Sequence, residues 1–353
     1  MNRGLFLNLD LAAAISRAKD EKKLLLVDCT AAGNQACELM NATWEDAKVG
    51  AVLADRAIAI RIDVDADKDA ARRLNVKRLP TVVGFRDGVE LDRIDAIHGP
   101  GLFLEWFDCL VRGETALQGQ RRLVRENPDN MEFRIHLASR LREAEAFDEA
   151  TTEYLWLWKH LLERAPEMLS VKHSILLMQL EGLVNRHAPA RAAFTAIRDA
   201  LQTDADEDQL LDWCALNQVL GETEKTLAWF DERRDRLDPE SIPRAIELHL
   251  EPLLIAAERW ADVGRVLRDP VGKLRVAAAE TNEVLARMEQ EMPGPILEPI
   301  RAQMLGHLPV TASMYVRALR AAGRDEDVRK LAAAAVEIDA SATMAAVFDP
   351  QKP

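Results

Sequence analysis

The chain has 353 residues, 48% of them hydrophobic and 30% charged, which is ordinary for a soluble globular protein of two or at most three domains. The formal net charge of −13 is uneven: residues 1–113 hold 16 basic against 18 acidic side chains, and the remainder holds 30 against 41. This acidic remainder argues against nucleic acid or an anionic membrane as the main partner, although it can also serve solubility alone.

The chain contains four cysteines, which are too few and too scattered for a disulfide framework: Cys29, Cys37, Cys109 and Cys214. No CxxC, HxxxH or HExxH motif occurs, so we expect no metal site and no cofactor. No run of 18 apolar residues occurs, so we expect no membrane insertion. These features predict a soluble, cytoplasmic protein.

One stretch near the N-terminus has the pattern of a strand, a tight turn and a helix. Residues 24–27 form a short apolar run, which is typical of a buried parallel strand. Small residues follow at 30–33, and Asn34 is well placed to cap a helix over residues 35–48. Cys37 would then lie near the start of this helix.

The rest of residues 1–113 alternates between helical and strand patterns. A two-residue hairpin turn is expected at Asp87 and Gly88. The predicted strands cover residues 57–64, 81–85 and 89–94, and the further predicted helices cover residues 9–21, 68–74 and 99–111. In the last helix we expect these side chains to pack on the sheet: Leu102, Leu104, Trp106, Phe107 and Leu110.

Two motifs in this region resemble the thioredoxin family. Thioredoxins read roughly V-D-F-W-A-x-W-C-G-P-C at the first motif, and the residues that match in register are Val27, Asp28, Ala31 and Cys37. The second motif, Leu79-Pro80-Thr81, is similar to the family's I/T/V-P-T segment, whose proline is cis. The resemblance implies that residues 1–113 form an α/β thioredoxin-like domain.

The departures from the family pattern affect its chemistry. Gly33 stands at the family's tryptophan position, and Asn34 stands at the position of the attacking cysteine. Thiol–disulfide exchange needs one thiolate to attack and a second thiol to resolve the mixed disulfide. Asn34 can cap the helix but cannot attack sulfur, and Cys37 matches the resolving position. A dithiol oxidoreductase is therefore not expected, and Cys37 is either a weakly reactive thiol or a small buried side chain.

The resemblance also suggests roles for Asp28, Leu79 and Pro80. Asp28 matches the family's buried aspartate, which helps deprotonate the resolving thiol; here it either keeps some residual chemistry or is hydrogen-bonded to its neighbours. The backbone at Leu79 and Pro80 would pair with an extended peptide, and Gly33 and Asn34 would leave the adjoining surface open. The alternative for Pro80 is that it only shapes the fold.

The remaining cysteines have structural interpretations. Cys29 follows Asp28 on a strand, so the two side chains point to opposite faces and a Cys29–Cys37 pair is not expected. Cys109 and Cys214 are expected in helix cores.

Residues 114–353 read as helical throughout, with Pro and Gly at intervals. Five segments resemble the start of a second helix in a repeat, and they begin at Phe147, Ala188, Gly221, Trp260 and Gly323. The segments around residues 129–154 and 314–340 resemble tetratricopeptide repeats. We therefore expect a tetratricopeptide-like α-helical solenoid over residues 114–353, with a less regular helical bundle as the alternative.

Two functions fit these observations. The first is a non-catalytic adaptor or chaperone-like module that binds protein or peptide segments, basic or amphipathic ones, through its helical repeats. The second is monothiol exchange or redox sensing through Cys37. Fold alone does not decide between them, because function depends on the site.

Overall fold

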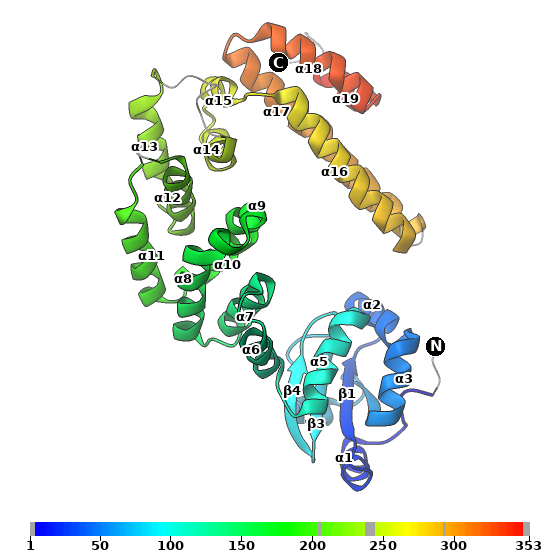
Figure 1. Ribbon diagram of the computed structural model, residues 1–353. Coiled ribbons are helices and arrows are strands. Elements are labelled where there is room, and N and C mark those ends of the chain that lie inside the picture. The colour runs from blue at the N-terminus through cyan, green and yellow to red at the C-terminus, as the bar shows by residue number, and fades with distance from the viewer. Residues whose placement is uncertain (1–3, 204–205, 237–243, 292–293, 349–353) are drawn as a thin grey trace. The chain divides into compact units, whose positions relative to one another are not determined.

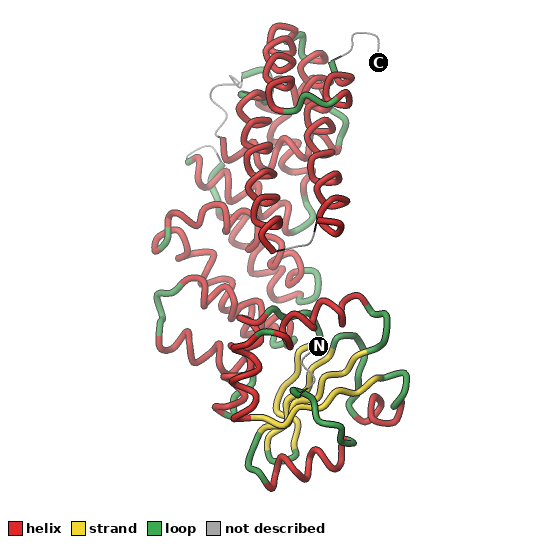
Figure 2. Tube along the Cα trace, turned by 90° about the vertical axis from the view of Figure 1, so that its right-hand side faces the viewer, coloured by secondary structure: helices red, strands yellow, loops and turns green. Residues whose placement is uncertain are grey.

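The computed structural model describes residues 4–203, 206–236, 244–291 and 294–348. The chain divides into two compact units, Met1–Met168 and Leu169–Pro353. Figure 1 labels the helices and strands, and Figure 2 shows the strands of the described residues gathered in one sheet. The predicted domain boundary, between residues 113 and 114, lies inside the first unit.

A four-stranded mixed sheet forms the centre of the first unit. In spatial order its strands are β2 (Ala57–Asp63), β1 (Leu24–Thr30), β3 (Thr81–Arg86) and β4 (Val89–Ile94). β1 is parallel to β2, as predicted from its apolar run, whereas the β1–β3 and β3–β4 pairs are antiparallel. Asp87 and Gly88 have positive φ angles of 52° and 77°, which suits the predicted two-residue hairpin between β3 and β4.

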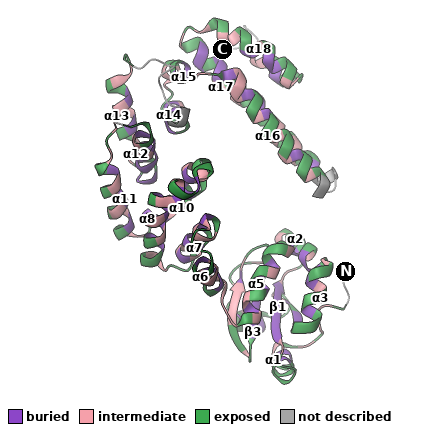
Figure 3. Cartoon of the chain, in the orientation of Figure 1, coloured by how far each residue is buried: buried purple, intermediate pink, exposed green. Residues whose placement is uncertain are grey.

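Helices cover both faces of this sheet, and each face has its own apolar core. The helices of one face are α1 (Leu11–Asp20) and α4 (Lys68–Arg73), and those of the other are α2 (Gln35–Glu45), α3 (Ala47–Arg56) and α5 (Pro100–Arg112). β1 supplies both cores because its side chains alternate: Leu26 joins the α2–α3–α5 core, and Leu25 and Val27 join the other. β1 is accordingly buried along its length in Figure 3.

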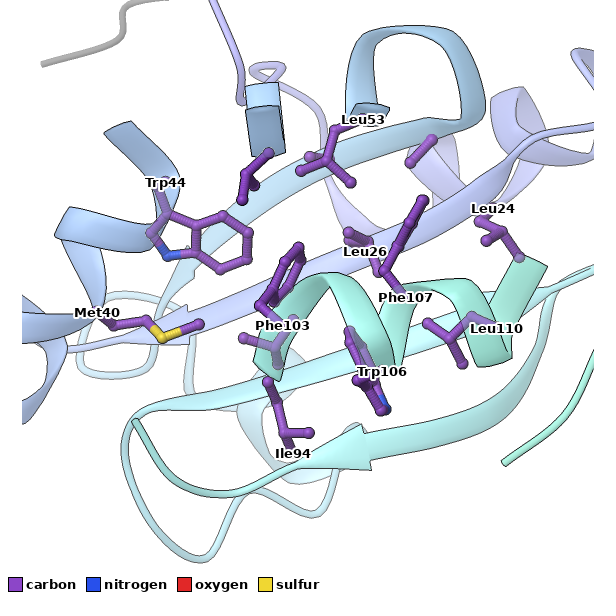
Figure 4. Packing of buried hydrophobic residues seen from close by; sticks show 14 residues of the cluster. Leu24, Leu26, Met40, Trp44, Leu53, Ile94, Phe103, Trp106, Phe107 and Leu110 are labelled. Atoms are coloured by element: carbon purple, nitrogen blue, oxygen red, sulfur yellow. The ribbon is translucent and has the colours of Figure 1, made fainter. Parts of the chain in front are cut away.

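The core beneath α5 is rich in aromatic side chains, as Figure 4 shows. The ring of Trp44 on α2 meets that of Phe103 on α5 edge-on, with a centroid distance of 5.0 Å. α5 approaches β3 closely at Gly84, where an added Cβ would lie 2.4 Å from the side chain of Leu110. This glycine therefore sets how tightly the closing helix seats on the sheet.

The prediction for the packing face of α5 is wrong at one position. Leu102 is 57% exposed, and Phe103 instead is completely buried. Trp106, Phe107 and Leu110 are buried as predicted, and Leu104 is partly buried. Residues 103, 106, 107 and 110 follow the three-to-four-residue spacing of one helical face, and residue 102 falls outside it.

The predicted helix over residues 35–48 is in fact two helices. Asp46 has an extended backbone, with φ −66° and ψ 131°, and this ends α2. Its carboxylate then accepts the N–H groups of Lys48 and Val49 and so caps α3. The sequence analysis missed α3, because no glycine or proline separates the two helices. The other predicted elements of residues 1–113 match within three residues at their ends.

Three further helices belong to the first unit: α6 (Ala116–Glu126), α7 (Met131–Glu143) and α8 (Phe147–Arg164). Asp92 of β4 ties α6 to the sheet, because its Oδ2 accepts the indole N–H of Trp106 at 3.2 Å and the backbone N–H of Ala116 at 2.7 Å. The side chain of Gln120 on α6 donates to the carbonyl of Phe133 on α7 at 2.8 Å. α6 is thus held on one side by the α/β region and on the other by the next helix.

The second unit is helical wherever the structure describes it. A π-helical turn spans Lys172–Leu176, and the α-helices are α9 (Leu169–Val171), α10 (Leu177–Val184), α11 (Ala188–Ala200), α12 (Glu207–Val219), α13 (Thr223–Arg233), α14 (Arg244–Ala256), α15 (Trp260–Val266), α16 (Pro270–Glu291), α17 (Gly294–Ala321), α18 (Asp325–Ile338) and α19 (Ala342–Val347). The predicted starts at Phe147, Ala188 and Trp260 are the first residues of α8, α11 and α15, and α13 and α18 begin two residues after Gly221 and Gly323.

Within this unit, helices contact the next or next-but-one helix in the chain. α12, for example, packs against α10, α11, α13 and α14, and α17 packs against α15, α16, α18 and α19. The described part of the chain has no helix with both the length and the apolar character needed to cross a bilayer.

We predict that Asp92→Ala lowers the free energy of unfolding by about 2 kcal/mol, because it leaves the N–H groups of Trp106 and Ala116 without their acceptor. Urea unfolding followed by tryptophan fluorescence measures this change, and hydrogen exchange at Ala116 should accelerate. Glu105→Ala, an exposed site on α5, is the matched control and should change stability little. A change at Asp92 no larger than at Glu105 would show that this contact does not hold α6.

Candidate functional site

The structure brings the two predicted motifs together at the carboxyl end of β1. Cys29 of β1 pairs with Thr81 of β3, so the Leu79–Pro80 segment lies directly beside the turn that leaves β1. The Leu79–Pro80 peptide bond is cis, as predicted. Pro80 is buried and Leu79 is partly buried. The turn, the start of α2 and the proline segment therefore form one corner of the first unit.

The turn itself is open at Gly33. Gly33 has a φ angle of +72°, a conformation that favours glycine, and it is exposed. No heavy atom lies within 4 Å of the place where its Cβ would stand. The N–H of Asn34 donates back to the carbonyl of Ala31 at 3.3 Å and closes the turn. A side chain at position 33 would project into open space, so the surface here is unobstructed.

Asn34 is the N-cap of α2. Its Oδ1 accepts the backbone N–H of Cys37 at 3.1 Å, and its backbone is extended, with φ −80° and ψ 112°. This is the arrangement that favours asparagine at helix starts. The residue at the family's attacking position therefore occupies the helix N-terminus with an amide oxygen, which cannot attack a disulfide.

Cys37 is the third residue of α2 and is only 5% exposed. Its N–H is taken by the Asn34 cap. All four cysteines lie in the part of the chain that the structure describes, and all four are free. Cys37 thus forms no disulfide with any of the other three cysteines, and its side chain is shielded from solvent.

Asp28 is paired with an arginine that the sequence analysis did not identify. Asp28 and Arg61 are register partners on β1 and β2, and the Nε–H of Arg61 donates to Asp28 Oδ2 at 2.7 Å. The same guanidinium donates to Asn41 Oδ1 on α2 at 3.1 Å and lies 4.3 Å over the ring of Phe6. The available signal was the arginine at position 61, which follows four apolar residues in this strand.

Burial dominates the protonation of Asp28. Loss of water raises the pKa of this carboxyl above its usual value, and the nearby charge and hydrogen bond of Arg61 lower it by less. The carboxyl is 3% exposed whereas Arg61 is 34% exposed, so the cation keeps contact with water and the anion does not. The sequence left two explanations for Asp28, residual chemistry or a carboxyl hydrogen-bonded to its neighbours. In the structure the carboxyl is hydrogen-bonded.

The loop between β4 and α5 also reaches this corner and was not predicted as part of it. The N–H of His98 points to the sulfur of Met40 at 3.5 Å, and the hydroxyl of Thr43 donates to the carbonyl of His98. Both partners lie on α2, so the loop is fixed to the helix that carries Cys37. Ile97 in the loop and Leu39 on α2 are 44% and 57% exposed, which adds apolar surface to this side of the unit.

The other cysteines are held as neutral thiols. Burial, followed by the charge of Asp28, raises the pKa of Cys29 to about 12, and burial raises that of Cys214 to about 12. Cys29 packs in the α1–α4 core, on the opposite face from Asp28, as predicted. Cys214 is buried as predicted, whereas Cys109 is only half-buried and lies where Gly119 lets α6 approach α5.

No set of three or more metal-binding side chains that could hold an ion occurs within the described residues. The site thus consists of a capped helix, one shielded thiol, a buried carboxyl paired with a partly exposed arginine, and an open turn.

Comparison with known proteins gives one sequence relative. A thioredoxin H-type from Oryza sativa subsp. indica is 31% identical over 85 residues, which make up 23% of this chain. The chain spans 65% of the length of that protein. No family model matches the chain.

A solved structure described as a malarial protein is also similar, at 22% sequence identity. The matched region makes up 23% of this chain and 90% of that structure's chain, and the TM-score is 0.22. The sequence relative and the site geometry agree with the motifs at residues 27–37 and 79–81. The chain has an N-terminal thioredoxin-like domain, followed by a helical region whose family is unknown.

Proposed function

We propose that this chain is a non-catalytic interaction protein, an adaptor or chaperone-like module that binds protein segments through its helical region. The observation that carries the proposal is the place of Asn34. The residue that would have to attack a disulfide is an amide that caps α2 and receives the N–H of Cys37. The corner keeps its geometry without the group that dithiol exchange requires.

The helical region supplies the larger binding surface in this proposal. Within each unit its helices contact their neighbours in chain order, which is also the packing of stacked helices in a tetratricopeptide-like solenoid. Such arrays present extended surfaces to partner segments. The thioredoxin-like domain contributes a second docking surface, where the backbone beside Pro80 and the open turn at Gly33 and Asn34 would accept an extended peptide.

Asp28 has a structural role in this proposal. Its carboxyl joins β1 to Arg61 on β2, and Arg61 in turn reaches Asn41 on α2. The residue therefore helps to hold the C-terminal half of α2 against the sheet, through Arg61, without taking part in a reaction.

One observation favours a second candidate, a monothiol exchanger or redox sensor that uses Cys37. Cys37 lies in the first turn of α2, where backbone N–H groups stabilise negative charge. Its 5% exposure works against this candidate, because an exchanging sulfur must be reached by its substrate. Measuring the reactivity of this thiol therefore separates the two functions.

We predict that native Cys37 reacts with iodoacetamide at neutral pH about tenfold or more slowly than in the urea-unfolded chain, because the reagent must wait for local opening. Mass spectrometry of timed samples reads each cysteine separately, and the buried Cys214 serves as the internal control. Labelling of Cys37 within seconds, at a rate that no longer rises with pH above neutrality, would favour the redox candidate and contradict the adaptor proposal.

We predict that the wild-type protein does not catalyse reduction of insulin disulfides by dithiothreitol, whereas Asn34→Cys does so at a measurable rate. The substitution places a thiol at the start of α2, three residues before Cys37, in a corner that is otherwise kept. Asn34→Ser is the matched control, because serine also caps helices but adds no thiol. Turnover by wild type equal to that of Asn34→Cys would show that Asn34 is not what prevents exchange.

We predict that Asp28→Asn gains stability relative to wild type as the pH rises above about 4, the usual pKa of an aspartate in an unfolded chain. The folded protein holds the Asp28 proton to higher pH than the unfolded chain does, so wild type loses this stabilisation as the pH rises from there through the raised pKa. Urea unfolding at several pH values measures the difference. Arg61→Gln should steepen the pH dependence of wild type, because it removes the charge that opposes the shift. A stability difference that shrinks with rising pH would mean that the ion pair outweighs burial.

A further inference from the structure

A groove in the second unit lies between α17 and α19. Its volume is about 1050 Å³, and its lining comes from the middle and C-terminal part of α17 and from most of α19. The two helices pack against each other, and Met344 of α19 is completely buried in the core beneath them. The wall formed by α19 is therefore anchored by its own buried side chain, and the groove lies between two helices that pack against each other.

One face of α17 forms the length of this groove. Gly306, Val310, Ser313, Arg317 and Arg320 line it at alternating intervals of four and three residues, which is the spacing of a single helical face. All five are exposed, and Val310 is 55% exposed although it is apolar. The face spans 15 residues from Gly306 to Arg320, or about 21 Å of helix.

The opposite wall consists of three small side chains of α19 and of Val347. Ala342, Thr343 and Ala346 of α19 line the groove, and small residues let a third backbone approach closely. Pro309 and Met314 add apolar surface on α17. Apart from the arginines, the groove is thus lined mainly by small and apolar side chains, which suit an elongated apolar stripe such as one face of a helix.

Two arginines at one end of the groove have no carboxylate partner within the described residues. Arg317 lies 4.2 Å over the ring of Trp260, and Arg320 has no ion pair or side-chain hydrogen bond there. None of the groove-lining residues is acidic. By contrast, Arg259 and Arg324 in the same unit bind Asp231 and Asp327.

The lack of a carboxylate partner for these two arginines among the described residues is unusual in a chain in which acidic side chains outnumber basic ones. The chain carries 59 acidic against 46 basic residues, so an arginine pair without an acidic neighbour is locally out of balance. Together with the apolar stretch beside it, this local positive charge complements a partner that is apolar on one face and acidic at one end.

We propose that this groove binds an amphipathic helix of a partner protein, with apolar side chains spaced three and four residues apart against α17 and carboxylates at the end that meets Arg317 and Arg320. The helix-in-groove mode fits the length and shape of the face. The inference rests on the proposed adaptor function and names its site and partner. The partner is amphipathic, as the sequence suggested, but acidic where it meets this groove, because local charge and not net charge governs the contact.

The probe for the test is a fluorescein-labelled, 16-residue amphipathic peptide with leucines at helical spacing and three glutamates at one end. A matched peptide carries lysines in place of the glutamates. Fluorescence anisotropy with the full-length protein should show binding of the acidic peptide and weaker binding of the basic one, and added salt should weaken the acidic complex.

Arg320→Glu should lower the affinity for the acidic peptide about fivefold or more, mainly through slower association, and should raise the affinity for the basic peptide. Arg329→Glu, at an exposed arginine of α18 outside the groove, is the matched control and should change neither. Val310→Asp should lower the affinity for both peptides, because it removes an apolar side chain from the lining of the groove.

Absence of binding by wild type, or equal effects of Arg320→Glu and Arg329→Glu, would overturn this inference. Sedimentation velocity without peptide tests a second copy of this chain as the occupant of the groove. A concentration-dependent dimer that is lost in Arg320→Glu would also overturn the inference. The adaptor proposal is judged separately by the reactivity of Cys37 and by insulin reduction, so failure at this groove leaves those results intact.

Discussion

The central strand β1 is shielded from water on both faces, and this constraint determines most of the first unit. Leu24 and Leu26 serve one core, and Leu25 and Val27 serve the other, so a single strand fixes the positions of five helices. The only carboxyl on the strand, Asp28, must find its partner inside the protein because no solvent reaches it. Arg61 supplies that partner from the neighbouring strand and extends to Asn41 on α2. The same residue thus satisfies a buried charge and locates the helix that begins at the candidate site.

At that site, the residues meet the structural requirements of a thioredoxin-like corner but not the chemical requirement for a thiol at position 34. A thioredoxin-like corner needs a helix start held firmly against the end of β1, and Asn34 meets this need with a side-chain cap. It does not meet the chemical need for a thiolate. The remaining cysteines do not compensate, since burial keeps Cys29 and Cys214 neutral and Cys29 faces the other core. The corner therefore combines a capped helix start, a cis proline and a buried acid with no thiol at position 34.

In the helical region, local charge differs from the overall balance. The sequence is acidic beyond residue 113, which suggested basic partners, yet the groove between α17 and α19 presents arginines and small or apolar side chains. Many arginines elsewhere are neutralised by neighbouring carboxylates, such as Arg259 by Asp231 and Asp262. Electrostatic attraction between exposed groups falls off over about 10 Å in salt, so a partner responds to the nearby side chains and hardly to the total charge.

The sequence by itself determined the order of elements in residues 1–113, the cap at Asn34 and the helical character of the rest, because each depends on neighbouring residues or on a local period. The cis bond before Pro80 was expected from the resemblance to thioredoxins, and the structure contains it. It also placed Cys29 and Asp28 on opposite faces, since a strand alternates. Tertiary structure alone decided the partner of Asp28, because Arg61 is 33 positions away and its register was not known. It also decided that Phe103 and not Leu102 enters the core, that the loop at His98 joins the corner, and that α6 is tied to the sheet through Asp92. These contacts join segments distant in sequence, and packing geometry, which no local pattern encodes, selects them.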